Sequence, residues 1–399
     1  MSEAYDALKA REQAAIMNTY GRYPLAIASG KGCRLYDCDG REYIDLLAGI
    51  AVCNLGHCRE EIAEAVAAKA RELVHVSNLF TQREQIELAE ALKSTCHAGK
   101  VFFCNSGAEA NEGAIKLARR YMRTVKNRDA YEVITLTHSF HGRTLATLTA
   151  TGQDKIKFGF DPLPEGFATV PAGDIEAMRR AVSPKTAAIL VECIQGEGGV
   201  LPLAKEYVDA LVALCREKDI LFMCDEVQCG MCRSGKFWAF QHYGVEPDVF
   251  TCSKALANGL PMGAVLATHE VAAGFAPGSH ATTFGGGALV STAAARTVGI
   301  MQKDRLAERA ARMGDFAMAL FEDVKAQHPG KIATIRGMGL MLGIELTFPG
   351  AEVWKKLLER GFILNLTQDT VLRLLPPLVI EQEDLKLFAS ALADVLGEV

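Results

Sequence analysis

The sequence predicts an α/β protein: a central domain with a mostly parallel sheet, joined to a smaller α+β domain built from both chain ends. Over the middle of the 399-residue chain, short continuous apolar runs alternate with amphipathic helical patterns. Such runs indicate strands that are buried on both faces of a parallel sheet. A chain of this length is also too long for one small core, so two or three structural units are expected.

Residues 1–57 are expected to form the N-terminal part of the smaller domain. A β-hairpin is predicted over residues 33–47, because two strand-like stretches flank a turn at Asp39-Gly40. No repeat, low-complexity tract or Pro/Ser-rich linker marks a boundary. The limit near residue 57 therefore comes from the change in periodicity alone.

Residues 58–295 are expected to form the large domain. Its strands are predicted at 101–104, 133–137, 187–191, 220–224, 249–252 and 263–268, and its helices at 60–73, 83–93, 109–123, 174–182 and 205–218. Residues 296–399 are expected to complete the small domain. A long helix near 290–325 leads into strands at 335–346, 362–366 and 371–375 and a last helix at 382–396.

Composition argues against several classes of protein. Hydrophobic residues make up 49% and charged residues 23% of the chain, and the net charge is −5, so no basic surface for nucleic acid is expected. No apolar run is long enough to cross a bilayer, and the N-terminus lacks the features of a signal peptide. The 12 cysteines are irregularly spaced, which favours reduced thiols in a cytoplasmic protein.

Ligands of open α/β sheets bind beyond the carboxyl ends of the strands, so the residues after each apolar run are the candidates for chemistry. The first run is followed by the small-residue turn Asn105–Asn111, which opens a helix. Backbone N–H groups at a helix N-terminus suit a phosphate. The alternative for this turn is an ordinary helix cap by Ser106.

The second and third runs end in aromatic and charged residues. Phe140 and Arg143 follow the second, a pair that could stack on a flat cofactor and bind a carboxylate. Glu192 and Glu197 follow the third run, where a structural glutamate paired with a neighbour is the alternative.

The fourth and fifth runs carry the strongest candidates. Asp225 ends five apolar residues and needs a cationic or N–H partner, because an unpaired buried carboxylate is costly. A protonated pyridine nitrogen would serve, as in enzymes that use pyridoxal phosphate (PLP). Lys254 follows the next run directly, as a Schiff-base nucleophile would. Together with the phosphate turn, these residues are predicted to meet at one edge of the sheet.

Three other motifs are weaker. His138 and His141 form an H-x-x-H pair without a third metal ligand. Cys229 and Cys232 form a C-x-x-C without a second pair at zinc spacing. The glycines of 337–343 lack the βα unit of a dinucleotide loop. No metal is expected.

The chain resembles the class III (fold-type I) PLP aminotransferases over nearly its whole length, from Asn18 to Leu378. The motifs that carry the resemblance are Phe102–Asn111, Ser139–Thr144, Glu192 with Gln195-Gly196-Glu197, Asp225–Gln228 and Ser253-Lys254. The resemblance implies the fold-type I architecture, PLP as cofactor and an amino-group transfer.

It also implies roles for individual residues. Lys254 would form the Schiff base and move the proton, and Asp225 would pair with the pyridine nitrogen. Thr283 would reach the phosphate of the neighbouring subunit, which implies a homodimer with active sites at the interface. The other cofactor-binding residues would be Ser106, Gly107, Ala108, Phe140, Glu192, Val227 and Gln228.

The implied substrates are an acylated diamino acid, N2-acetyl-L-ornithine, and 2-oxoglutarate. Arg373 resembles the arginine that grips the α-carboxylate of glutamate, and Glu197 the glutamate that neutralises it when the other substrate is bound. Tyr20, Arg143 and Thr282 would bind the acylornithine. Ile50 stands where ornithine δ-aminotransferases carry a tyrosine, which argues for a substrate without a free α-amino group.

Alternatives remain within and beyond this chemistry. Succinylornithine, N-succinyl-diaminopimelate, ornithine and 4-aminobutyrate are other possible amino donors. A PLP racemase or aminomutase would keep the amino group on its substrate and make no glutamate. A non-catalytic binding protein would have no need of a buried lysine and aspartate.

Overall fold

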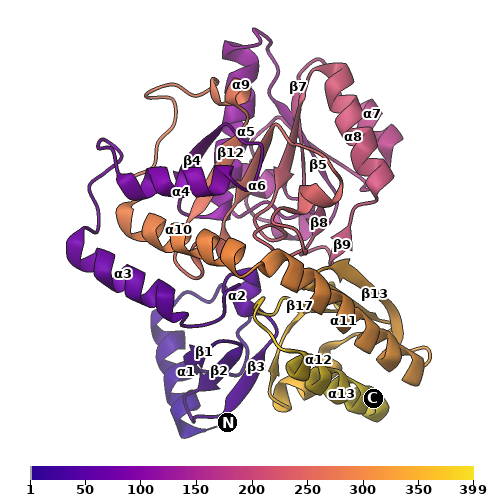
Figure 1. Cartoon of the computed structure of the whole chain (residues 1–399). Helices are drawn as coiled ribbons and strands as arrows, with labels where there is room; N and C mark the ends of the chain where they lie inside the picture. The colour runs from indigo at the N-terminus through magenta and orange to yellow at the C-terminus, as the bar shows by residue number, and fades with distance from the viewer. Residues whose placement is uncertain (1) are drawn as a thin grey trace.

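The computed structural model describes residues 2–399, which form a large region around a seven-stranded sheet and a smaller region that holds both chain ends (Figure 1). The strand order is β4 (Lys100–Cys104), β12 (Gly263–Ala267), β11 (Val249–Cys252), β10 (Leu221–Asp225), β7 (Thr186–Val191), β5 (Glu132–Leu136) and β6 (Phe167–Val170). Strand β12 runs antiparallel to both neighbours, and the other pairs are parallel. The predicted mostly parallel sheet is confirmed.

Both faces of this sheet are covered, which explains the continuous apolar runs. Helix α5 (Gly107–Thr124) packs on one face with Leu221 and Met223. On the other face, α8 (Lys205–Lys218) and α10 (Ala288–Lys303) share a core with Phe222 and Cys224. Successive residues of a strand point to opposite faces, so every residue of β10 is buried and apolar until Asp225.

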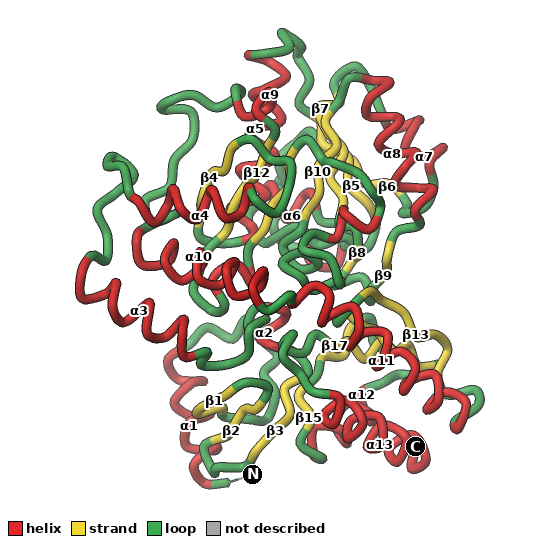
Figure 2. The backbone as a smooth tube through the Cα atoms, viewed as in Figure 1, coloured by secondary structure: helices red, strands yellow, loops and turns green. Residues whose placement is uncertain are grey.

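The remaining elements of the large region surround the sheet (Figure 2). Helices α3 (Glu60–Glu72), α4 (Arg83–Lys93) and α7 (Ile175–Ala181) lie where the sequence predicts them. The short elements of this region are α6 (Leu145–Ala150), α9 (His269–Ala272), β8 (Ile194–Gln195), β9 (Leu201–Pro202) and 3₁₀ turns at Asp154–Ile156, Ala239–His242 and Lys254–Ala257. The short helix α2 (Ala48–Ala51) directly follows β3 (Glu42–Asp45) of the smaller region.

The smaller region joins the two chain ends through a sheet. Strands β1 (Ile27–Lys31), β2 (Arg34–Asp37) and β3 (Glu42–Asp45) are followed in it by β15 (Phe362–Ile363), which pairs with β3 in parallel. Strands β2 and β3 are the predicted hairpin. A second sheet has the order β13 (Ile332–Met338), β14 (Met341–Leu346), β17 (Val371–Leu374) and β16 (Asn365–Thr367). The domain limits at residues 57 and 295 stay predictions.

One predicted helix is wrong in its extent. The helix expected near 290–325 is two helices, α10 and α11 (Leu306–Gln327), because Arg305 adopts a left-handed conformation with φ of 51°. Apolar residues recur on both sides of this break, so periodicity alone does not reveal it. Helices α1 (Glu3–Ala15) and α12 (Ala351–Glu359) were not predicted, and α13 (Gln382–Glu398) was. Helix α1 buries none of its residues and so has no apolar stripe.

Among residues 2–399, the structure contains no helix whose length and apolar character would let it span a bilayer.

Candidate active site

The carboxyl ends of the parallel strands enclose a cavity of about 220 Å³. The predicted residues among those that line it are Gly107, Ala108, Phe140, Arg143, Glu192, Glu197, Asp225, Val227, Gln228 and Lys254. These residues come from the ends of β4, β5, β7, β10 and β11. The fold therefore brings the separate strand-end candidates into one site.

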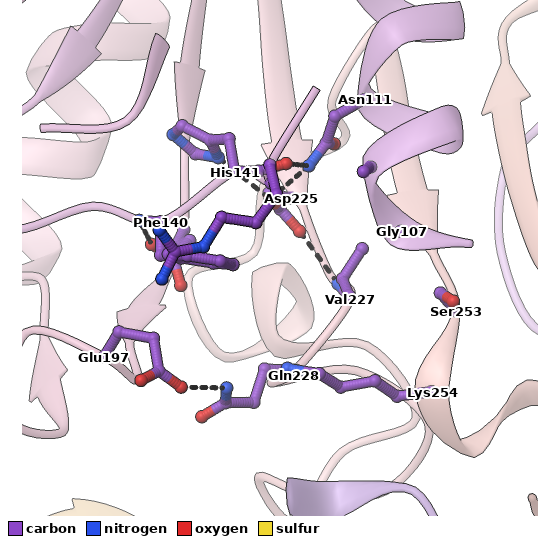
Figure 3. A pocket seen from close by; sticks show the side chains of 14 residues that line it. Gly107, Asn111, Phe140, His141, Glu197, Asp225, Val227, Gln228, Ser253 and Lys254 are labelled. Carbon is purple, nitrogen blue, oxygen red and sulfur yellow. Dashed lines mark hydrogen bonds and ion pairs between the residues drawn. The ribbon is translucent and has the colours of Figure 1, made fainter. Parts of the chain in front are cut away.

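Asp225 is buried at the floor of this cavity and is held by neutral and basic donors. Its Oδ2 accepts a hydrogen bond from Asn111 Nδ2 at 2.7 Å and lies 2.8 Å from His141 Nδ1 (Figure 3). Its Oδ1 accepts one from the Val227 backbone N–H at 3.0 Å. Asn111 is oriented in turn by the Thr251 hydroxyl at 2.7 Å. These partners satisfy both oxygens of the buried Asp225 carboxyl group.

Sequence reasoning did not identify Asn111 and His141 as partners of Asp225. His141 was considered only as a metal ligand, and Asn111 only as part of the phosphate turn. A signal existed for Asn111: it is a polar residue on the buried face of α5, between Ala110 and Gly113. A buried amide needs hydrogen-bond partners, and this one finds them across the sheet.

Lys254 opens the 3₁₀ turn that follows β11, and its side chain lines the cavity. Burial lowers the pKa of its amine below the ordinary value, although the nearby Glu197 opposes that shift. A larger fraction of neutral amine makes a lysine a better nucleophile and base.

The turn after β4 has the features of an anion site. The Ser106 hydroxyl caps α5 by accepting a hydrogen bond from Glu109 N at 3.1 Å, and Gly107 and Ala108 line the cavity. A Cβ atom on Gly107 would lie 2.7 Å from Val227 Cγ1, so only glycine leaves this turn room beside Val227. The positive end of a helix and an open backbone suit a phosphate group.

An ion pair lies at one side of the cavity, where Glu197 lines the cavity and Arg373 contacts Glu197. Arg373 Nη1 lies 2.5 Å from Glu197 Oε1, and Gln228 Nε2 donates to the same oxygen at 3.2 Å. Arg373 is 1% exposed and also donates to Asn365 Oδ1 at 2.6 Å. Burial alone would raise the pKa of the Glu197 carboxyl, but Arg373 and Lys254 bring it below its ordinary value. An ionised Glu197 therefore shields the charge of Arg373.

The opposite wall is formed by the segment after β5 and by Glu192. The Oε1 atom of Glu192 accepts a hydrogen bond from Phe140 N at 2.8 Å. Burial, with a contribution from Asp225, raises the pKa of Glu192 well above its ordinary value. The Arg143 guanidinium lies over the Phe140 ring, 5.5 Å from its centroid.

Six residues that were assigned by resemblance do not line the cavity of the single chain: Tyr20, Ile50, Ser106, Thr282, Thr283 and Arg373. Tyr20 is 69% exposed, and Ile50 lies on the short element α2. The Thr282 hydroxyl accepts a hydrogen bond from Asn105 Nδ2 at 3.0 Å, and Thr283 is exposed on the same loop. Their assigned roles stay predictions. Cys229 and Cys232, the C-x-x-C pair, are buried free thiols.

Known proteins resemble the chain over almost its full length. The family model "Aminotransferase class-III" matches residues 15–396. The chain belongs to the class III aminotransferases. A relative in Methanocaldococcus jannaschii named acetylornithine aminotransferase is 46% identical, with 96% of each chain covered.

Two solved structures agree with this class III assignment. Ornithine aminotransferase from Toxoplasma gondii, whose structure is described as having partial occupancy of PLP at the active site, matches with a TM-score of 0.94 and 31% identity over 100% of this chain and 95% of that one. Acetylornithine aminotransferase from Elizabethkingia anophelis matches with a TM-score of 0.88 and 30% identity over 99% of each chain. The predicted fold and family are confirmed.

As a class III aminotransferase, the chain is a PLP-dependent transaminase. The cavity fits this cofactor on its own chemistry: a helix N-terminus for the phosphate, a supported carboxylate at Asp225 for the pyridinium, and an amine of lowered pKa at Lys254 for the aldehyde. Phe140 and Val227 offer apolar surfaces for the ring.

Proposed function

We propose that this class III aminotransferase transfers the δ-amino group of N2-acetyl-L-ornithine to 2-oxoglutarate, as a step in arginine biosynthesis. The products would be N-acetyl-L-glutamate 5-semialdehyde and L-glutamate. The observation that carries the proposal is the Arg373–Glu197 ion pair beside the cavity of Lys254, because opening this pair would give the same cavity a second charge state. The name and 46% identity of the Methanocaldococcus jannaschii relative support the choice of acyl-amine.

The catalytic work of the chain centres on Lys254. The cofactor supplies an electron sink for the substrate carbon that bears the amino group. Lys254 Nζ would remove the proton from that carbon and deliver it to C4′ of the cofactor. The lowered pKa of the Lys254 amine favours the neutral form that can accept the proton. Asp225, held by Asn111 and His141, would pair with the pyridine nitrogen of the cofactor. Glu192 accepts the backbone N–H of Phe140, whose side chain would pack on the cofactor ring.

We propose that the choice between the two substrates depends on whether Arg373 is bound to Glu197 or to a substrate carboxylate. With acetylornithine bound, Glu197 stays on Arg373 and the arginine presents no free charge. With glutamate or 2-oxoglutarate bound, Glu197 moves away and Arg373 binds the α-carboxylate through its guanidinium. Arg373 and Glu197 belong to segments far apart in the chain, so Glu197 could move away from Arg373 without a change in the strand that carries Arg373.

The acetylornithine side of the site is proposed to use Arg143, Tyr20 and Thr282. Arg143 lines the cavity and could bind the α-carboxylate of the acylated amino acid. Ile50 would give that amino acid an apolar neighbour in place of a hydroxyl. Thr283 is exposed, and we propose that it completes the phosphate site of a second copy in a cytoplasmic homodimer.

A single-turnover absorbance experiment tests the substrate. The purified enzyme is mixed in parallel with N-acetylornithine, ornithine, 4-aminobutyrate, succinylornithine and N-succinyl-diaminopimelate. The visible band of the bound cofactor should bleach fastest with N-acetylornithine and return on addition of 2-oxoglutarate. A faster response to another amine would mean that this amine is the substrate, and the assignment as a transaminase would stand. Bleaching without formation of glutamate from 2-oxoglutarate would favour a racemase or aminomutase.

Ornithine is the second candidate donor, because ornithine aminotransferase from Toxoplasma gondii superimposes on the whole chain. Ile50 argues against it. The same experiment separates the two donors in one preparation.

A further inference from the structure

The turn that carries Lys254 needs support from outside itself. Lys254 has a φ of 42°, a left-handed conformation that side chains other than glycine adopt only at a cost. The 3₁₀ turn Lys254–Ala257 is four residues long and ends at Asn258, which is also left-handed with φ and ψ of 45°. An isolated 3₁₀ turn has poor hydrogen-bond geometry and does not hold such a conformation alone.

Asn258 supplies this support with its side-chain amide. Its Oδ1 accepts a hydrogen bond from the Leu55 backbone N–H at 2.9 Å, and its Nδ2 donates to the Gly56 carbonyl at 3.2 Å. Both polar ends of one side chain therefore bind consecutive residues of another segment. Asn258 does not line the cavity, so it acts on the site only through the turn that it closes.

Leu55 and Gly56 belong to a segment, residues 45–57, that is itself held firmly. The N–H and C=O groups of His57 pair with Gly32 at 2.8 and 2.9 Å. His57 Nε2 lies 2.6 Å from Asp45 Oδ2, and the other oxygen of Asp45 accepts the N–H groups of Leu47 and Ala48. The two hydrogen bonds from the Asn258 side chain to Leu55 and Gly56, here called the clamp, are thus anchored to the first sheet of the smaller region.

The same segment also holds the strand of Arg373. The carbonyl of Leu46 accepts a hydrogen bond from Leu375 N at 2.7 Å, and that of Asn54 accepts one from Leu378 N at 2.8 Å. One segment therefore contacts the turn of the lysine and Leu375 and Leu378, which follow the strand of the arginine. The positions of Lys254 and Arg373 are therefore linked through residues 45–57.

We propose that Asn258 is a positioning residue, whose amide fixes the Lys254 turn against residues 45–57 and so sets Lys254 relative to the Arg373 side of the cavity. The inference goes beyond the proposed function, because it needs only the family chemistry at Lys254 and no particular amino donor. Small displacements of a reacting group have large kinetic effects, so the clamp should act on turnover more than on binding.

The test compares Asn258→Gly with Asn127→Gly. Glycine keeps the left-handed backbone and removes only the amide. Asn127 is the matched control: it is left-handed with φ of 54° and exposed, and no hydrogen bond of its side chain is found in residues 2–399. Asn258→Asp keeps the acceptor for Leu55 and loses the donor to Gly56, so it should fall between Asn258→Gly and the wild type.

Two readouts are needed. With an amino donor that the wild type accepts, kcat of Asn258→Gly should fall about tenfold or more, with KM changed by less than about threefold. In the apoenzyme, hydrogen exchange of the amides in 254–258 should become at least about tenfold faster than in Asn127→Gly, while global unfolding temperatures stay close.

The proposal is overturned if kcat and local exchange of Asn258→Gly match those of Asn127→Gly. It is also overturned if Asn258→Gly raises KM alone and leaves kcat unchanged. If Asn258→Gly does not fold, the same two readouts on Asn258→Asp decide. A wild type that ignores N-acetylornithine but uses another donor refutes the proposed substrate and leaves this test intact.

Discussion

Asp225 illustrates how single residues acquire their role from their surroundings. The carboxylate is 3% exposed, yet Asn111, His141 and Val227 stabilise its negative charge. An unpaired charge at this depth would cost several kcal/mol, on the order of that measured for broken buried pairs. The hydrogen bonds therefore offset part of the free-energy cost of burying this carboxyl group, and a pyridinium would offset more.

Replacing the lysine tests the central assignment. In Lys254→Ala, turnover should fall at least on the order of 10⁴-fold, because the variant loses both the nucleophile and the proton carrier. The cofactor should still bind, through the Gly107–Ala108 turn and Asp225. Steady-state assays and a fluorescence titration with PLP measure the two effects. Turnover near that of the wild type would reject Lys254 as the catalytic lysine.

Replacing the arginine tests the two-substrate site. In Arg373→Ala, kcat/KM for glutamate should fall on the order of 10²-fold, because one partner of a buried charged pair is lost. The acetylornithine half-reaction should change less, since Arg373 is neutralised there by Glu197. Single-turnover rates for each half-reaction give the ratio. Glu197→Gln is the paired variant and should harm the acetylornithine half more; equal losses in both halves would contradict the assignment.

At the scale of elements, the turn at Ala48–Ala51 is the most strained part of the smaller region. Ala48, Ile50 and Ala51 all have φ between 51° and 67°. The carboxylate of Asp45 caps this turn with two hydrogen bonds and pairs with His57. The ion pair therefore contributes to the shape of the element that carries Ile50.

This pairing makes a prediction about stability and pH. The hydrogen bond to Asp45 raises the pKa of His57 from 6.5 to about 10 in the folded chain. Because the folded pKa lies above the unfolded one, the pair stabilises the fold fully below pH 6.5, and that contribution is lost as the pH rises through 10. His57→Gln keeps a hydrogen-bonding side chain and does not titrate.

Denaturant unfolding at several pH values measures the effect. The difference in unfolding free energy between the wild type and His57→Gln should shrink steadily from pH 6.5 to 10. A difference that does not change over this range would mean that His57 is not protonated in the folded state.

The proposed homodimer belongs to the scale of the whole molecule. The loop of Thr282 and Thr283 is bound to the end of β4 by Asn105 and to the segment before α4 by Asn78. Its exposed Thr283 and Phe284, the latter 66% exposed, are available to a second copy. Aromatic residues are enriched at protein interfaces, so the exposed Phe284 is compatible with a dimer contact on this loop.

Subunit mixing tests this arrangement. Thr283→Ala should weaken PLP binding by about tenfold through loss of a hydrogen bond to a charged phosphate. Mixing Thr283→Ala with Lys254→Ala should restore tight binding and activity, because a hybrid dimer pairs an intact lysine with an intact threonine from the other subunit. Equilibrium titration and activity after subunit exchange measure the recovery. No recovery would place Thr283 at its own subunit's site or at none.

Much of the large region could be predicted from the sequence, because burial on both faces of a strand leaves a local trace. The apolar runs before Asp225 and Lys254 were of this kind, and their polar ends identified candidates for the site. The family resemblance then added Arg373 and gave Glu197 its role, and the comparisons confirmed the family and the cofactor. The break at Arg305 was missed, because both sides of it keep the same apolar periodicity.

Sequence by itself therefore determined the fold class, the strand-end candidates and, through the motifs, the reaction. Tertiary structure alone decided that Asn111 and His141 meet Asp225 and that Asn258 meets Leu55. The physical reason is the distance along the chain over which each kind of information extends. Periodicity records whether a residue is buried, which depends on near neighbours, whereas a hydrogen bond between residues far apart in the chain depends on how whole elements pack.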